Sequence, residues 1–230
     1  MNPTTTPAGT EADGPRRPAR VPSPATGHRG GGAEVPAPAD TPERAIGVPH
    51  LAGRFVQLRP VDGRDYDFLF DLYTTGNHLV RYRLRGATPG PEDFVRFLWD
   101  KVLTQFMVTT PEGRRIGLVT CYEPDFRNRF AYLAACSVEE YESTGLVLEG
   151  VGLLVSYLFE TFDLRKVYAE SLECNYEQFA LGEGRLFDVE GRLKDHEYLH
   201  GAYQDMVLLA IHRDSWRDQH QRLFGEEARF

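Results

Sequence analysis

The chain has 230 residues, of which 41% are hydrophobic and 12% aromatic, enough to build the core of one ordinary domain. Its formal net charge of −8 argues against a general nucleic-acid binder, because such proteins normally carry a basic surface. The three cysteines are an odd number without the spacing of metal ligands, so we expect no disulfide framework and a reducing, cytoplasmic environment.

Residues 1–46 are predicted to form a disordered tail rich in proline, glycine and alanine. The first aromatic residue is Phe55, and nine of the fifteen prolines precede Ala45, together with a run of three glycines at 30–32. Such a segment buries too little apolar surface to offset the entropy of ordering it. It also lacks the apolar stretch of a secretory leader, which agrees with a cytoplasmic location. We therefore place a single folded domain at residues 47–230.

The rest of the chain alternates between strand-like and helix-like patterns. Strands are indicated by alternating or continuous apolar runs that end at turn residues, and helices by apolar side chains three and four residues apart. The expected elements are a strand at 55–60, helices at 65–72 and 91–103, a hairpin from 106–110 and 116–122, a strand at 130–137, a helix at 146–162, and strands at 165–172 and 204–212. This order predicts a mixed α/β domain with a crossover helix packed on a sheet.

The stretch 146–162 is the most apolar part of the chain. It contains Glu149, Ser156 and Glu160, and it is too short and too polar to span a bilayer. We therefore expect a buried crossover helix and no association with a membrane.

Six short motifs follow one another along the second half of the chain. They are Gly145-Leu-Val-Leu-Glu149, Leu164-Arg-Lys-Val-Tyr168, Glu173-Cys-Asn175, Phe187-x-x-Glu-Gly-Arg-Leu193, His196-x-Tyr-x-x-Gly-x-Tyr-x-Asp205, and Leu209-Ala-Ile211 with Trp216. In this order and spacing, residues 55–216 resemble the GNAT superfamily of N-acyltransferases, most closely its branch of Rim-type ribosomal-protein acetyltransferases. The resemblance implies a mixed, mostly antiparallel central sheet flanked by helices and splayed at a thioester cleft.

The resemblance also implies where an acyl donor binds. Backbone amides at the start of the long helix suit the pyrophosphate of acetyl-CoA or another acyl-CoA, since a helix N-terminus attracts anions. A backbone amide of the preceding strand would stabilise the oxyanion of the tetrahedral intermediate, and an asparagine would contact pantetheine. The implied donor-binding residues are Ser137, Val138, Ser143, Thr144, Gly145, Leu146 and Asn175.

The phosphate-binding turn departs from the family pattern at two positions. Glu142 stands where the family has Gln or Arg, and Val147 replaces a small residue, so a negative charge and a branched side chain are expected near the pyrophosphate. These departures leave open a donor carried by an acyl carrier protein, which presents pantetheine without the nucleotide. Gly182 stands where other members have a tyrosine acid, so the usual general acid cannot be assigned.

Two residues are candidates for catalysis. Glu173, at the end of a strand that borders the predicted cleft, is a candidate general base or water-holding residue; the alternative is an exposed charge at a strand end. Tyr203 is a candidate for the acceptor side, with a tyrosine of the core as the alternative. Cys174 is disfavoured as a nucleophile because no histidine base can be assigned to it.

The segment His196-Glu-Tyr-Leu-His200 matches the H-E-x-x-H motif of zinc peptidases. That chemistry requires both histidines on one face of a helix, but Gly191 and Gly201 bound a segment without an apolar helical stripe. We therefore expect no metal site here.

The sequence thus predicts acyl transfer to a primary amine of a protein, a peptide or a small metabolite by direct attack on the thioester. A homodimer is compatible with this prediction. Two alternatives stay open, namely a carrier-protein-dependent acyltransferase of natural-product tailoring and a non-catalytic GNAT-fold protein that binds a thioester or a partner.

Overall fold

The computed structural model describes residues 51–224, which lie within one compact unit, Ala45–Phe230. The predicted tail, residues 1–46, lies outside the described residues. The helices are α1 (Tyr66–Thr74), α2 (His78–Arg81), α3 (Pro91–Trp99), α4 (Leu146–Thr161), α5 (Glu173–Tyr176) and α6 (Arg213–Phe224), with single turns η1 (Gly63–Asp65), η2 (Glu139–Tyr141) and η3 (Ala180–Gly182). The strands are β1 (Leu51–Ala52), β2 (Gln57–Pro60), β3 (Val102–Thr109), β4 (Arg115–Asp125), β5 (Phe130–Ser137), β6 (Lys166–Leu172), β7 (Asp188–Leu199) and β8 (Ala202–His212).

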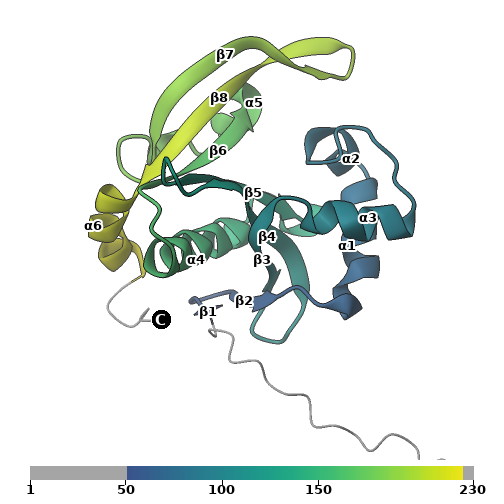
Figure 1. The fold of residues 1–230 in the computed structure, drawn as a ribbon, viewed down its shortest axis with the longest axis horizontal. Helices are drawn as coiled ribbons and strands as arrows, with labels where there is room; N and C mark the ends of the chain where they lie inside the picture. The colour runs from purple at the N-terminus through teal and green to yellow at the C-terminus, as the bar shows by residue number, and fades with distance from the viewer. Residues whose placement is uncertain (1–50, 225–230) are drawn as a thin grey trace, which may run out of the picture. The chain divides into compact units, whose positions relative to one another are not determined.

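These strands form one open sheet in the order β1-β2-β3-β4-β5-β6-β8-β7 (Figure 1). Every neighbouring pair is antiparallel except β5 and β6, which run parallel and are connected through helix α4. A parallel pair needs such a crossover connection, whereas an antiparallel pair can be closed by a short turn. The predicted fold class, a mixed and mostly antiparallel sheet flanked by helices, is confirmed.

Helices cover both faces of the central strands. Because successive side chains of a strand point to opposite faces, neighbouring residues of β3 and β4 enter different cores. Phe106 and Val119 pack with helix α4, whereas Met107 and Leu118 pack with helices α1 and α3. Burial on both faces explains why these strands read as nearly continuous apolar runs.

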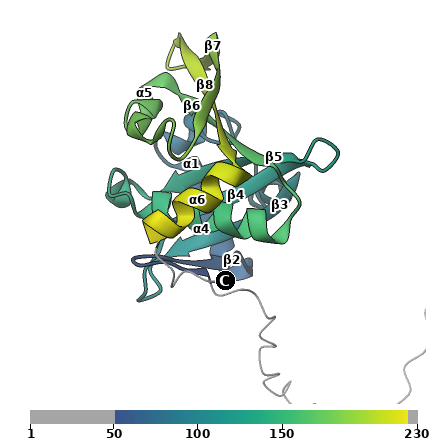
Figure 2. The same cartoon turned by 90° about the vertical axis from the view of Figure 1, so that its left-hand side faces the viewer.

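Helix α4 is the buried crossover helix that the sequence predicts. Gly150 brings it close to the sheet, since a Cβ atom there would lie 3.1 Å from a methyl group of Val108. Ser156 is buried but satisfied, because it donates a hydrogen bond to the Gly152 carbonyl (3.1 Å) and accepts one from the Trp216 indole of α6 (2.9 Å). Figure 2 shows α6 lying across α4. Within residues 51–224, no helix is both long and apolar enough to cross a membrane.

Two of the differences from the sequence-based expectation have a clear physical reason. The helix predicted at 91–103 ends at Trp99, because Lys101 has the left-handed φ of 54° and strand β3 already begins at Val102. No residue range was predicted for strand β7. Most of its side chains are exposed, so it lacks the apolar alternation that indicates a strand. Its partner β8 supplies the backbone hydrogen bonds that keep it extended.

Candidate active site

The sheet opens between β5 and β6. The two strands pair with each other from Phe130↔Lys166 to Leu133↔Ala169. Beyond that point β5 continues to Ser137 and β6 to Leu172, but the two strands no longer pair with each other. The backbone groups along these last residues therefore border a gap. The loop that leads to α4 follows one side of the gap, and α5 follows the other. This is the splay that the sequence predicts.

One backbone amide at the rim of the gap is directed toward it. Val138 donates its N–H to the Ile116 carbonyl of β4 (2.9 Å), so this predicted oxyanion donor is already engaged within the sheet. Adjacent residues of a strand direct their N–H groups to opposite sides. The amide of Ser137 therefore points toward β6 and the gap. Of the two predicted residues, Ser137 is the one whose amide can meet a thioester oxygen.

The predicted phosphate turn lies at the N-terminus of helix α4. Ser143 (φ 66°) and Gly145 (φ 80°) are both left-handed, and they turn the chain sharply from η2 into the helix. The Thr144 hydroxyl donates to the Tyr141 carbonyl (2.7 Å) and accepts from the Leu146 amide (3.3 Å). Amides of a first helical turn have no partner within the helix, and the Glu149 amide already donates to the Gly145 carbonyl (3.1 Å), so those of Val147 and Leu148 can meet an anion. The structure thus brings Ser143, Thr144, Gly145 and Leu146 together as predicted.

Three acidic residues near this turn have partners in the structure. Glu140 lies 2.5 Å from a guanidinium nitrogen of Arg114, and Glu142 lies 3.6 Å from Nε2 of His78. Glu149 accepts hydrogen bonds from the amides of Arg54 and Phe55, which fasten the β1–β2 connection to α4. The positive charge of Arg114 offsets that of Glu140, so a pyrophosphate would meet less negative charge at this turn.

Val147 does not crowd the approach of a phosphate, contrary to the sequence-based expectation. Its side chain is buried in the core beneath α4. A Cβ atom on Gly117 of strand β4 would lie 2.9 Å from a Val147 methyl group and would also collide with the Cys136 carbonyl. The glycine on the strand makes room for the valine on the helix.

Glu173 and Asn175 lie together on α5, at the far side of the gap, but Glu173 is engaged. Its carboxylate is paired with the guanidinium of Arg192 on β7, which also lies 5.0 Å from the ring centre of Tyr176. Tyr203 lies elsewhere, because β8 pairs with β6 only as far as Met206↔Leu172 and Tyr203 belongs to the part of the hairpin beyond that pair. The Tyr203 side chain is 63% exposed and contacts the ring of Tyr198. The structure therefore does not bring the two predicted catalytic residues together.

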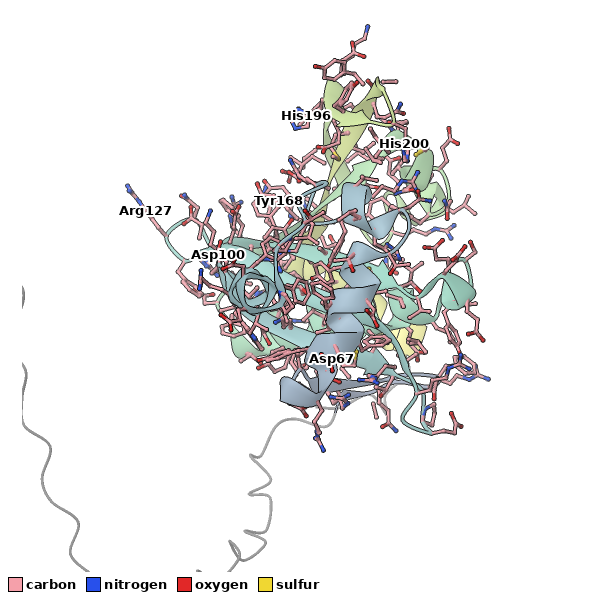
Figure 3. The ribbon with its side chains drawn as sticks, turned by 90° about the vertical axis from the view of Figure 1, so that its right-hand side faces the viewer. Asp67, Asp100, Arg127, Tyr168, His196 and His200 are labelled. Atoms are coloured by element: carbon pink, nitrogen blue, oxygen red, sulfur yellow. The ribbon has the colours of Figure 1, made fainter. Side chains whose placement is uncertain are left out.

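A row of tyrosines leads to the gap on the face opposite α4. Tyr122, Tyr132 and Tyr168 are direct register partners on β4, β5 and β6, and their ring centres are 5.9 and 5.4 Å apart. Burial, together with the charge of Glu170, raises the pKa of Tyr122 to about 12. Figure 3 shows Tyr168 between the α1–α3 helices and the β7–β8 hairpin.

Glu170 stands at the end of this tyrosine row, and it is the functional candidate that the sequence-based prediction missed. It follows Tyr168 by two residues and so shares its face of the sheet, just past the last β5–β6 pair. Continuing the register would put Glu170 opposite Ala134, whose small side chain leaves the carboxylate accessible. Among residues 51–224, no hydrogen bond or ion pair of its carboxylate is found. The available signal was a single acidic residue within the predicted strand 165–172.

The H-E-x-x-H segment lies in strand β7 and the turn after it. Residues four apart in an extended strand are separated by about 13 Å, so these two histidines cannot share one metal ion. Figure 3 shows His196 and His200 on opposite sides of the hairpin. Across the described part of the chain, no group of three histidine, cysteine, aspartate or glutamate side chains is placed to hold a metal.

An open sheet that parts at its single parallel pair, beside a free strand amide and a helix N-terminus, defines a class of acyl-thioester-binding α/β folds. The chain matches the acetyltransferase (GNAT) domain family over residues 56–183, more than half of its length. It therefore belongs to the GNAT acetyltransferase family, and the resemblance drawn from the six motifs is confirmed.

Two curated relatives match part of the chain. The "Putative ribosomal N-acetyltransferase YdaF" of Bacillus subtilis is 25% identical over 108 residues, which cover 47% of this chain and 59% of that protein. The chain thus spans about three fifths of the length of this relative, whose name agrees with the predicted Rim-type branch. A spermidine N(1)-acetyltransferase of Vibrio cholerae is 25% identical over 120 residues, which cover 52% of this chain and 69% of that protein.

Solved structures confirm the fold. A Vibrio cholerae spermidine N-acetyltransferase in complex with CoA and spermine has a TM-score of 0.62 at 21% identity, covering 70% of this chain and 98% of that chain. A structure of a spermidine/spermine N-acetyltransferase from the same organism, in complex with manganese ions, has a TM-score of 0.61 at 21% identity, with 71% and 96% covered.

Proposed function

We propose that this protein is an N-acyltransferase that moves an acyl group, in the simplest case acetyl, from acyl-CoA to a primary amine. The observation that carries the proposal is the gap between β5 and β6, with the Ser137 amide at its rim and the N-terminus of α4 beyond it. A thioester placed in this gap presents its carbonyl oxygen to a fixed donor, while the free amides of α4 meet the pyrophosphate. We expect Asn175 to contact the pantetheine arm from the opposite side of the gap.

The structure does not favour a carrier-protein donor. A carrier-protein donor was left open because Glu142 and Val147 were expected near the pyrophosphate, but Glu142 lies beside His78 and Val147 points into the core. Without that argument, acyl-CoA is the simpler donor. We also keep the cytoplasm as the proposed location.

Direct attack requires a neutral amine. A primary alkylamine is protonated at neutral pH, with a pKa of about 10.4 for an unperturbed lysine side chain, so the site must accept a proton. Glu170 is free to do so, directly or through a water molecule, whereas Glu173 is held by Arg192. When the amine attacks, a C–N bond forms and the C–S bond breaks, while the Ser137 amide stabilises the negative oxygen. The departing thiolate takes a proton from solvent.

The experiment combines acetyl-CoA with a panel of primary amines and measures release of the CoA thiol together with the mass of the acetylated product. We expect Glu170→Gln to lower kcat by about 100-fold or more without weakening acetyl-CoA binding, which is the scale of a lost general base. The matched control is Glu177→Gln, an exposed carboxylate on the segment after α5, which should behave as the wild type. A protein that binds acetyl-CoA but acetylates no amine would instead support the non-catalytic alternative.

A further inference from the structure

The acceptor side of the gap contains two opposite charges without a counter-ion. Glu170 is one. The other is Arg83, in the segment between α2 and α3, whose guanidinium donates to the carbonyls of Asp100 (3.1 Å) and Leu98 (3.5 Å). Among residues 51–224, no carboxylate lies within ion-pair distance of Arg83. Glu170 and Arg83 do not pair with each other, so each has a charge available for a ligand.

Both charges act on one side chain, Tyr122. The guanidinium of Arg83 lies 5.5 Å from the centre of the Tyr122 ring and 5.0 Å from that of Phe97, which holds it in place. After burial, the largest influence on the Tyr122 pKa is Glu170, which raises it, and Arg83 has the opposite effect. Arg83 thus lies over Tyr122 at one end of the row Tyr122–Tyr132–Tyr168, and Glu170 follows Tyr168 at the other end, on the same face of the sheet.

Further arginines come from the same short segment. Arg85 lies 3.6 Å from Glu197 of β7, and 60% of its side chain is exposed. Arg81 is also exposed, and its described side-chain contact is with the sulfur of Cys174 at 4.0 Å. Residues 81–85 thus contribute three arginines, of which Arg85 has Glu197 as a partner. A polyamine would bring several positive charges next to these arginines, which is electrostatically unfavourable.

We propose that the acceptor is an amine that also carries an anionic group such as a carboxylate, with its ammonium at Glu170 and its anionic group at Arg83 and Arg85. This inference rests on the proposed function, since it assigns the acceptor of that same site. Arginine suits the role because its planar guanidinium can donate two parallel hydrogen bonds to a carboxylate. The tyrosine faces beneath can contact the ammonium and the alkyl chain of the acceptor.

The test is a binding measurement that does not depend on acyl transfer. Dissociation constants are measured by ligand-observed NMR, in the presence of CoA, for β-alanine, 4-aminobutyrate and 6-aminohexanoate, for alkylamines of matching length, and for spermidine. We expect at least one amino acid to bind about tenfold more tightly than its matching alkylamine and than spermidine. Arg83→Gln should remove this advantage and leave the affinity for the alkylamines within about twofold.

Arg83 also binds two backbone carbonyls, so folding of its variant is checked by thermal unfolding, and Arg85→Gln provides a second, exposed position. The matched control is Arg127→Gln, because Arg127 is exposed and points away from Tyr168 in Figure 3. The inference is overturned if spermidine or the alkylamines bind as tightly as the amino acids, or if neither arginine variant discriminates between them. Amines that bind but are never acetylated would count against the proposed function instead.

Discussion

At the start of helix α4, two adjacent side chains have opposite environments. Val147 is 8% exposed and packs over Gly117, whereas Leu148 is 57% exposed. In the family pattern, the second small residue of the turn lies next to the phosphate. Here the residue at that position, Val147, points toward the sheet instead. The bulk that seemed to obstruct the donor is compensated by the missing side chain at Gly117.

We predict that Val147→Ala lowers the free energy of unfolding by about 1–3 kcal/mol, because it removes two methyl groups from the core. It should not tighten the binding of CoA, since the side chain does not face the phosphate turn. Chemical denaturation and calorimetric titration with CoA measure the two effects. Leu148→Ala is the matched control and should change stability by less than about 0.5 kcal/mol. A clear gain in CoA affinity for Val147→Ala would show that the valine does obstruct the turn.

Glu170 and Glu173 are close in sequence but have different partners in the structure. The two carboxylates are three residues apart, yet one lies beside a row of tyrosines and the other is paired with Arg192. The sequence identifies both as acids near the end of one strand. Which of them is free depends on β7, an element that contributes Arg192 from nineteen residues away.

At the scale of elements, strand β7 is held to the sheet by more than its ladder with β8. Lys166, on β6, donates to both carboxylate oxygens of Glu190 on β7 (2.8 and 2.7 Å), and the Tyr168 hydroxyl donates to the same carboxylate (2.8 Å). Burial alone would raise the pKa of Glu190, but the hydrogen bond from Lys166 and its charge bring it below the usual value. Burial alone would lower the pKa of Lys166, but Glu190 raises it.

We predict that Glu190→Gln destabilises the protein by about 1–3 kcal/mol at neutral pH, because it leaves the nearly buried Lys166 without its counter-ion. Because the pKa of Glu190 is lowered in the folded state, the Glu190 carboxylate stabilises that state at pH values above its ordinary pKa of 4.5. This contribution disappears as the pH falls through the lowered pKa. Because the pKa of Lys166 is raised, its ammonium stabilises the folded state at pH values below the ordinary pKa of 10.5. This contribution is lost as the pH rises through the raised pKa.

Urea denaturation of the wild type and of Glu190→Gln between pH 3 and 8 measures this linkage. The difference between the two proteins should be constant near neutrality and shrink as the pH approaches the acid limit. The control is Asp188→Asn, because Asp188 lies on the same strand and its side chain is more exposed than that of Glu190. A difference that stays the same down to pH 3 would contradict the ion-pair explanation.

At the scale of the whole molecule, the chain consists of the compact unit Ala45–Phe230 and the residues before it. We predict that removal of residues 1–44 leaves the melting temperature within about 1 °C and the binding of acetyl-CoA unchanged, since that segment has no aromatic residue and many prolines. Differential scanning calorimetry of the full and shortened chains provides the measurement. A drop of several degrees would mean that the segment packs on the domain.

The sequence alone determined the fold class, because the apolar strand patterns, the long crossover helix and the six ordered motifs are all local signals. It also predicted the turn at Ser143 to Gly145, which directly precedes that helix, as the candidate phosphate site. The bounds of strand β7 were not predicted, because its side chains are mostly exposed and its extended form depends on β8.

Only the tertiary structure decided which groups are free to act. The parallel pairing of β5 and β6 brings Tyr132 next to Tyr168, and the end of that pairing leaves Ser137 and Glu170 at an open gap. Polar groups of Glu142, Glu173 and Val138 are not free, because each contacts a group that is far away in the sequence. Whether a polar group is engaged depends on what the fold places within hydrogen-bond distance, and no local pattern records that distance.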